Sequence, residues 1–250
     1  GKFASVLRSR EDLNTCGISS FTVGKTNYRG LEGTWKDAED GELSRNAIEQ
    51  GSVDSTVAIH CAVHPEKRTE VTLWLCAGKS LEESLSLQQT VLTETPERLH
   101  RNSHNYWKSW VNKKQIDFGT LTAKTIDLYK RSLLITRTHI DRNGGIIAAA
   151  DRDIMAFNRD TYTYMWPRDG AFVSLAMDRA GYQEVTRSFF HFCARVQQPD
   201  GYLLHKYNPD GSVGSSWHPW LSKSGEAQLP IQEDETALVI YALYKHFQSV

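Results

Sequence analysis

The stretch TYTYMWPRDG, residues 161–170, decides how the second half of the chain is interpreted. It sets two tyrosines, a tryptophan and a proline directly before an Arg-Asp pair and a glycine. As scaffold, Asp169 would cap a following helix, Pro167 would fix the approach to it, and Arg168 would pair with an acid elsewhere. As a site, an arginine fork beside a carboxylate suits neighbouring hydroxyls of a sugar ring, and aromatic faces suit its C–H side. Both interpretations stay open on these residues alone.

Apolar residues after Phe118 recur at helical spacing. Two stripes predict helices, and they consist of Ile126, Tyr129, Leu133 and Ile140, and of Val185, Phe189, Phe192 and Val196. A further helix is expected to begin near Asp169 and to end at Gly181, a residue typical of C-caps. The segment ETALVIYALYKHF (235–247) is apolar nearly all round, which predicts a helix buried within a helical assembly. The second half should therefore be all-α.

Two further features lie between the last two of these predicted helices. Pro-Asp-Gly occurs at 199–201 and 209–211, which predicts a small hairpin in a long loop. The segment LPIQEDETAL (229–238) holds Gln232 and three consecutive acids at a helix start. Acids in a first turn interact favourably with the helix dipole, so we expect ionised carboxylates that accept hydroxyl hydrogen bonds rather than donate protons. A scaffold role and a functional role both fit this segment.

The first 78 residues favour β structure. Strand-like runs occupy 17–25, 54–64 and 68–78, and PEKR between the last two predicts a hairpin. From Ser80 the pattern becomes helical and continues past Pro96, in segments polar enough for a linker. The helices of the second half would leave a core unfinished, so we expect the chain to be a segment of a longer protein.

Composition excludes several classes of function. The formal net charge is −1, with 40% hydrophobic and 24% charged residues, and no basic excess points to nucleic acid. No apolar run is long enough to span a bilayer. The first twelve residues lack the apolar core of a signal peptide, which slightly favours a cytoplasmic location. Nothing in the sequence indicates the oligomeric state.

No metal or organic cofactor is expected. Cys61 lies between His60 and His64, but neighbours at odd spacing in a strand point to opposite faces, so these side chains would not converge on a metal. Cys61 and Cys76 are interpreted as buried free thiols.

The two clusters carry a resemblance to a known family. YTYMWPRDGAFVSLAMDRAGY and LPIQEDETALVIYALYKHF resemble glycoside hydrolase family 15, the glucoamylases, in the bacterial and archaeal branch that includes glucodextranases and trehalases. The stretch GTWKDAEDGELSRNAIEQGSVDST (33–56) is similar to the N-terminal β-sandwich of that family. The resemblance implies part of an antiparallel β-sandwich at 1–78, a helical linker at 79–116 and the first helices of an (α/α)6 catalytic barrel at 117–250.

The resemblance also implies roles for single residues. Arg168 and Asp169 match the pair that holds the terminal glucose, and Tyr162 and Trp166 match aromatic residues that line the same subsite. Asp234 and Gln232 fall in the stretch that contributes polar contacts around the pocket. Trp217 and Trp220 lie where the family builds part of the pocket rim. Fungal members carry Thr at the position of Pro167, and Asn-Asp-Gly at the position of the three acids.

The activity implied is inverting, exo-acting hydrolysis of α-glucosidic bonds, which releases glucose from the non-reducing end of α-glucans. In such enzymes an acid and a base lie about 6.5–9.5 Å apart. The family's catalytic glutamates match no residue here and are expected beyond Val250, so this chain alone is expected to be inactive. Rival interpretations are trehalose or dextran hydrolysis, a non-catalytic sugar-binding or regulatory relative, and a purely structural helical scaffold.

Overall fold

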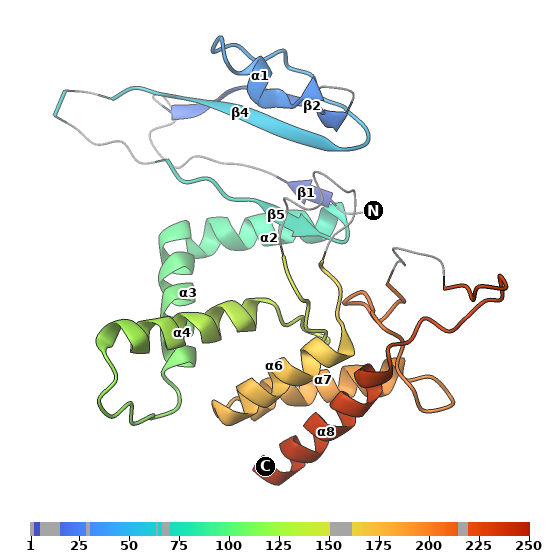
Figure 1. Ribbon diagram of the computed structural model, residues 1–250. Helices are drawn as coiled ribbons and strands as arrows, with labels where there is room; N and C mark the ends of the chain where they lie inside the picture. Colours follow the sequence, from blue (N-terminus) through green and yellow to red (C-terminus); the bar gives the residue numbers. More distant parts are fainter. Residues whose placement is uncertain are drawn as a thin grey trace. The chain divides into compact units, whose positions relative to one another are not determined.

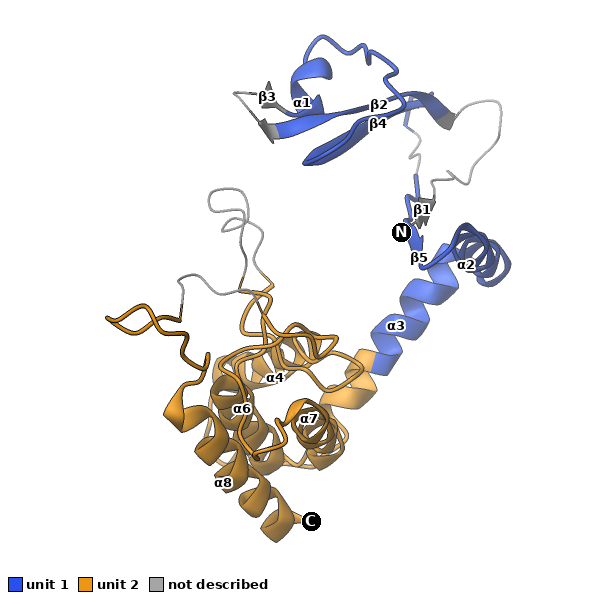
Figure 2. Cartoon of the chain, turned by 90° about the vertical axis from the view of Figure 1, so that its right-hand side faces the viewer, with its two compact units in different colours: residues 1–106 blue, residues 107–250 orange. Residues whose placement is uncertain are grey.

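The computed structural model describes residues 3–5, 16–28, 31–63, 65–66, 71–150, 162–214 and 220–250. The chain divides into two compact units, residues 1–106 and 107–250, shown along the chain in Figure 1 and by unit in Figure 2. Strands lie in the first unit, and the second is built from helices and loops.

The first unit holds two small antiparallel sheets. One has the order β3-β2-β4, with β2 (Cys16–Tyr28) between β3 (Leu31–Glu32) and β4 (Val53–Cys61). The other pairs β1 (Phe3–Ser5) with β5 (Cys76–Gly78). The predicted strands at 17–25 and 54–64 are thus confirmed.

The hairpin predicted across PEKR is wrong. β4 pairs with β2 and β5 pairs with β1, so the two expected partners lie in different sheets. Of the described residues in the predicted strand 68–78, only Cys76–Gly78 form a strand. Alternation of apolar and polar residues indicates which face of a strand is buried, but it does not identify the partner strand.

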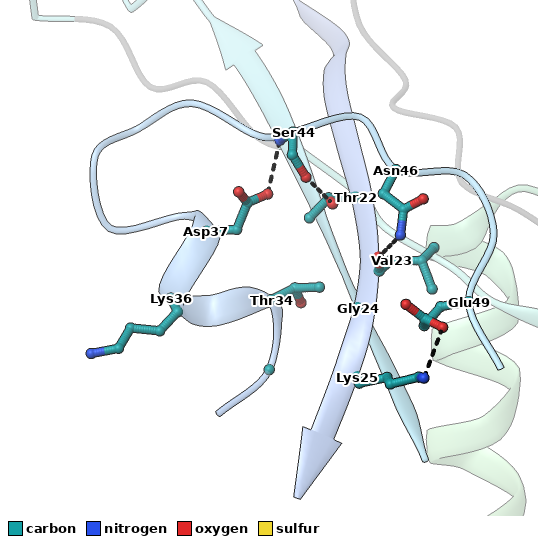
Figure 3. A pocket seen from close by; sticks show the side chains of 11 residues that line it. Thr22, Val23, Gly24, Lys25, Thr34, Lys36, Asp37, Ser44, Asn46 and Glu49 are labelled. Carbon is teal, nitrogen blue, oxygen red and sulfur yellow. Dashed lines mark hydrogen bonds and ion pairs between the residues drawn. The ribbon is translucent and has the colours of Figure 1, made fainter. Parts of the chain in front are cut away.

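A polar loop between β3 and β4 is tied to β2. The chain first forms α1 (Thr34–Asp37), and the Asp37 carboxylate accepts a hydrogen bond from the Ser44 N–H at 2.8 Å. Asn46 then donates to the carbonyl of Val23 at 2.7 Å. Figure 3 shows these contacts around a pocket of about 570 Å³. The polar side chains of this segment therefore fold the loop against the strand.

Helix α2 (Leu81–Glu94) begins where the sequence predicts it. The Ser80 hydroxyl accepts from the Glu83 N–H at 3.1 Å, and the Glu83 carboxylate accepts in return from the Lys79 N–H at 2.6 Å. This reciprocal arrangement satisfies N–H groups that a helix start leaves open. Helix α3 (Pro96–Val111) follows after Thr95, whose φ of 64° interrupts the helical run.

The cysteines only partly match the sequence interpretation. Cys76 is a buried free thiol, as expected. Cys61 is disulfide-bonded, so its interpretation as a free thiol is wrong. The register of β2 and β4 sets the backbone of Cys16 opposite that of Cys61, and spacing along one strand could not reveal this neighbour. In the described part of the chain, no three His, Cys, Asp or Glu residues are grouped as a metal site requires, and His64 lies outside that part.

In the part of the second unit that the structure describes, four long helices follow the end of α3. They are α4 (Ala123–Thr138), α6 (Pro167–Arg179), α7 (Gln183–Val196) and α8 (Glu233–Ser249). Helix α6 begins at Pro167 rather than near Asp169, and Asp169 makes no capping hydrogen bond. Its end is as predicted, because Gly181 adopts a φ of 84° and the Tyr182 N–H reaches the Met177 carbonyl at 2.9 Å.

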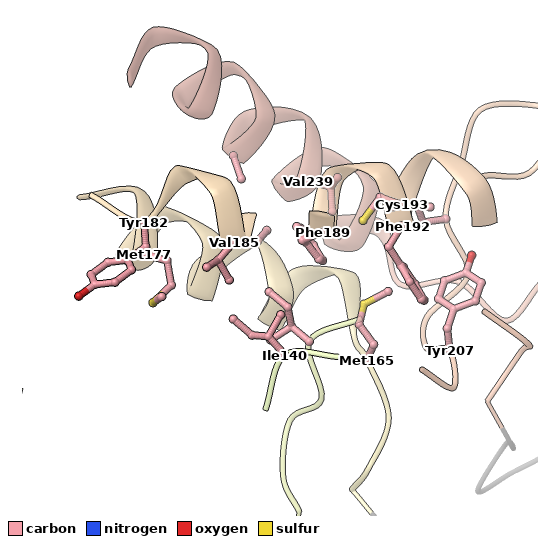
Figure 4. Packing of buried hydrophobic residues seen from close by; sticks show 14 of the residues in the cluster. Ile140, Met165, Met177, Tyr182, Val185, Phe189, Phe192, Cys193, Tyr207 and Val239 are labelled. Atoms are coloured by element: carbon pink, nitrogen blue, oxygen red, sulfur yellow. The ribbon is translucent and has the colours of Figure 1, made fainter. Parts of the chain in front are cut away.

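The core of this unit is centred on α7. Figure 4 shows Val185, Phe189 and Phe192 following one another along that helix, and all three are buried. A Cβ on Gly170 of α6 would lie 2.3 Å from the Phe189 ring. The glycine of the Trp-Pro-Arg-Asp-Gly sequence is therefore needed for close packing of α6 on α7.

Only one side of α8 is buried. Val239 and Ala242 face the core, whereas Ile240, Tyr244 and Phe247 on the opposite side are exposed. The prediction of a fully buried helix is met on one side alone, because no described element covers the other. In addition, no described helix combines the length and apolar character that crossing a bilayer requires.

The two Pro-Asp-Gly sequences each close a separate tight turn. The Gln198 N–H donates to the Tyr202 carbonyl at 2.9 Å, and the Asn208 N–H donates to the Ser212 carbonyl at 2.8 Å. Tyr207 forms antiparallel bridges with Val213 and with Met165. The loop is thereby paired with the aromatic stretch that precedes α6.

A buried polar network joins α6, α7 and α8. The Thr186 hydroxyl donates to the Asp178 carboxylate at 2.5 Å, and His246 Nδ1 lies 3.0 Å from the same carboxylate. All three side chains are buried. Buried polar groups that hydrogen-bond to one another stabilise a single arrangement. Loss of one partner leaves the others buried without a hydrogen bond, which lowers the free energy of unfolding.

We predict that Thr186→Val lowers the free energy of unfolding of the complete chain by about 1–3 kcal/mol, because the Asp178 carboxylate loses a buried donor. The control is Thr138→Val on the exposed end of α4, which should change it by less than about 0.5 kcal/mol. Urea unfolding measures both. Equal effects of the two variants would contradict the network.

Candidate functional site

The two sequence clusters meet at Arg168. This residue lies in the first turn of α6, and side chains at the start of α8 surround its guanidinium. Its Nη1 donates to Gln232 Oε1 at 2.8 Å and to both carboxylate oxygens of Asp234 at 3.3 Å. Asp169 lies 3.5 Å from Nη2. The structure therefore brings together four of the predicted site residues.

Glu235 is a fifth member that sequence reasoning did not select. Its side chain is fully buried, and its Oε2 accepts a hydrogen bond from the backbone N–H of Arg168 at 2.5 Å. Its Oε1 forms an ion pair with Arg168 Nη1 at 3.3 Å but accepts no hydrogen bond from the described residues. The sequence carried one usable signal, because Glu235, Val239, Ala242 and His246 recur at the helical spacing of a buried face.

Burial raises the pKa of Glu235 to about 7, and the charges of Asp234 and Asp169 act in the same direction. The N–H and guanidinium of Arg168 oppose this rise without cancelling it. The expectation that all acids of this cluster are held ionised is therefore wrong for Glu235, because loss of hydration outweighs the helix dipole. The pKa of the Arg168 guanidinium is raised above its ordinary value. Burial acts to lower this pKa, but the charges of the surrounding carboxylates outweigh the effect of burial.

The aromatic residues form two layers. Trp166 is only 7% exposed, whereas Tyr162 is 41% exposed and stacks on it with ring centroids 5.8 Å apart. Tyr164 meets Trp166 edge-on, and Lys206 Nζ lies 4.1 Å from the Tyr164 ring centroid. Tyr162 thus offers an accessible face, while Trp166 is largely covered by its neighbours.

Of the two predicted rim tryptophans, one lies in the described part of the chain. Trp217 lies outside the described residues. Trp220 is partly buried, with its ring 5.1 Å from that of His205. The His205 N–H donates to the Pro230 carbonyl at 2.8 Å, which ties this loop to the segment just before α8.

The arrangement provides acceptors beside a fixed cation. The Asp169 and Asp234 side chains are 46% and 52% exposed, so their carboxylates are accessible to hydroxyl groups. Glu235 is enclosed and cannot reach a ligand without rearrangement. The cluster is suited to binding a neutral polyol through charge-assisted hydrogen bonds.

We predict a pH-dependent stability caused by Glu235. Its pKa is about 7 in the folded chain against an ordinary value of 4.5, so between these pH values the folded state retains a proton that the unfolded state has lost. Stability is then highest below the unfolded pKa and falls as pH rises from 4.5 to 7, by about 3 kcal/mol. Glu235→Gln removes this titration. The free energy of unfolding of the variant minus that of the wild type should therefore increase by about this amount between pH 5 and 8.

The control for this prediction is Glu233→Gln, an exposed acid in the same helical turn. Its unfolding free energy should differ from the wild type by a constant small amount over the same pH range. Urea unfolding at several pH values measures both differences. Parallel curves for Glu235→Gln and the wild type would contradict the raised pKa.

Comparisons with known proteins give a family model, a curated relative and a solved structure that match this chain. The model of the glycosyl hydrolases family 15 matches residues 123–249. An uncharacterized glycosyl hydrolase of Methanocaldococcus jannaschii is 24% identical over 238 residues, which cover 92% of this chain and 35% of the relative. A crystal structure of a bacterial glucoamylase complexed with acarbose has a TM-score of 0.58 at 21% identity, over 93% of this chain and 32% of its own.

The chain thus spans about a third of the length of these two relatives. The likeness to the solved glucoamylase shows a shared fold. The family model covers half of the chain and includes both clusters that meet at Arg168. The chain belongs to the glycosyl hydrolases family 15.

Proposed function

We propose that the complete protein is a glycoside hydrolase of glucoamylase type. It releases glucose from the non-reducing end of α-glucans by exo-acting, inverting hydrolysis, and this chain carries the subsite for the terminal glucose. Family membership supports glycoside hydrolysis. The solved relative was crystallised with acarbose, which supports a carbohydrate ligand for a protein of this fold.

One observation carries the assignment of the subsite. The N-terminal turns of α6 and α8 meet so that Arg168, Asp169 and Asp234 form one accessible cluster of charges. Each hydroxyl of a sugar can donate one hydrogen bond and accept another, and this cluster supplies partners for both. In our proposal Asp169 and Asp234 accept from hydroxyls, and Arg168 donates to them.

The remaining predicted residues complete the subsite. Tyr162 supplies the accessible aromatic face, and Trp166 holds Tyr162 in place from behind. Gln232 orients Arg168 through its 2.8 Å hydrogen bond. Trp217 and Trp220 belong to the rim of the same pocket. We assign neither the catalytic acid nor the catalytic base to residues 1–250. In our proposal the complete protein supplies both.

The same proposal includes the domain organisation. Residues 1–78 would belong to an antiparallel β-sandwich, 79–116 to a helical linker and 117–250 to an (α/α)6 barrel. The antiparallel sheets of the first unit and the helical pairs of the second support this order. The likeness to a bacterial glucoamylase over 93% of the chain supports it as well.

We predict that Asp169→Asn, in the complete gene product, lowers turnover of maltotriose by about a thousandfold. The amide keeps the shape of the side chain but loses the charge that strengthens hydrogen bonds to the sugar. Asp127→Asn on the exposed face of α4 is the matched control and should keep the native rate. Glucose release measures both, and a near-native rate for Asp169→Asn would remove this residue from the site.

A substrate series separates the alternatives. Maltotriose, isomaltose, dextran and trehalose share a terminal glucose and differ in the bond that is cleaved. Preferential cleavage of maltotriose supports the glucoamylase type, and preference for dextran or trehalose assigns another specificity. Sugar binding without cleavage of any of them would indicate a non-catalytic relative.

A further inference from the structure

Helix α6 starts without a cap of its own. Trp166 at its N-cap makes no side-chain capping hydrogen bond, and Pro167 in the first position has no N–H. The N–H of Arg168 is therefore the first donor of the helix, and it has no partner within α6. Glu235 supplies that partner from α8, with Oε2 2.5 Å away.

The same carboxylate also contacts the tip of Arg168. Glu235 Oε1 lies 3.3 Å from Nη1. Glu235 therefore contacts Arg168 both at its backbone N–H and at its guanidinium. Glu235 is fully buried and extends from the helix that also presents Asp234. The two contacts fix the position of α6 relative to α8 at the point where the charged cluster forms.

We propose that Glu235 is the positioning residue of the sugar subsite. It holds the first turn of α6 and the Arg168 guanidinium in one geometry, so that Arg168, Asp169 and Asp234 are preorganised for the sugar. This inference rests on the proposed function of the cluster. Glu235 acts through Arg168 and does not touch the sugar, because its side chain is fully buried.

Protonation of Glu235 should change this positioning. The groups that act on it or are affected by its charge are Arg168 and Asp169 of α6, Asp234 of α8, Cys193 of α7 and Tyr207 of the preceding loop. A proton on Oε1 leaves the hydrogen bond at Oε2 intact but removes the charge that attracts Nη1. The ionised form therefore holds Arg168 more firmly than the neutral form.

The test uses the complete gene product with maltotriose. Glu235→Gln keeps the shape and an acceptor for the Arg168 N–H, but it has no charge to attract Nη1. At pH 8, where Glu235 of the wild type is ionised, we expect kcat/KM to fall by about 10²-fold, while the thermal midpoint at pH 5 stays close to that of the wild type. Glu233→Gln, exposed in the same turn, should stay within about twofold of the wild type.

The pH profile separates positioning from a purely structural role. In the wild type, kcat/KM should carry an ionisation near pH 7 that raises it with increasing pH, and this ionisation should be absent in Glu235→Gln. Wild-type and Gln profiles that run parallel would overturn the inference. A binding measurement with maltose over the same pH range gives a second readout that is independent of the catalytic acid.

Arg168→Ala distinguishes failure of the inference from failure of the proposed function. If Arg168→Ala loses turnover and Glu235→Gln keeps native kcat/KM, the subsite stands and the role of Glu235 is wrong. If Arg168→Ala keeps native turnover, the subsite itself is wrong and the inference falls with it. If both lose turnover and Glu233→Gln does not, the inference is supported.

Discussion

The contact between the buried Glu235 carboxylate and Arg168 is the constraint on which the candidate site depends. A carboxylate withdrawn from water must find compensating donors, and here one residue supplies both a backbone N–H and a guanidinium. The two partners are 67 positions apart in the sequence. Through these two contacts the fold brings the start of α6 to the start of α8, and the exposed acids of both helices come together as a consequence.

Three carboxylates around a single guanidinium would repel one another in a uniform medium. Two features reduce that repulsion. Asp169 and Asp234 lie in the first turns of α6 and α8, where each helix end carries a partial positive charge. Burial of Glu235 raises its pKa, so its negative charge is partly withdrawn near neutrality. The cluster can then leave two carboxylates accessible to a ligand while Arg168 remains charged.

Local features of this chain followed from the sequence, whereas pairings did not. The start of α2 at Ser80 and the end of α6 at Gly181 are encoded within a few neighbouring residues, and both were predicted. The partner of β4, the bonded state of Cys61 and the buried side of α8 depend on which elements meet. Hydrophobic periodicity indicates which face of an element is buried, but it does not identify the element that packs on that face. For the same reason the sequence does not distinguish the acids at the start of α8, although only Glu235 is buried.

The aromatic residues that crowd before Arg168 divide, like the acids at the start of α8, into buried and exposed side chains. Trp166, Glu235 and Lys206 are almost fully buried, and Lys206 places its ammonium over the Tyr164 ring. This inner layer cannot bind a ligand, but it leaves the outer residues few alternative positions. Tyr162 can stack only where Trp166 supports it, and Arg168 can turn only as far as Glu235 allows. Binding geometry is most precise when a packed layer fixes the rotamers of the residues in front of it. The unusual composition of the stretch thus has two causes, since one set of side chains is accessible and another holds that set in place.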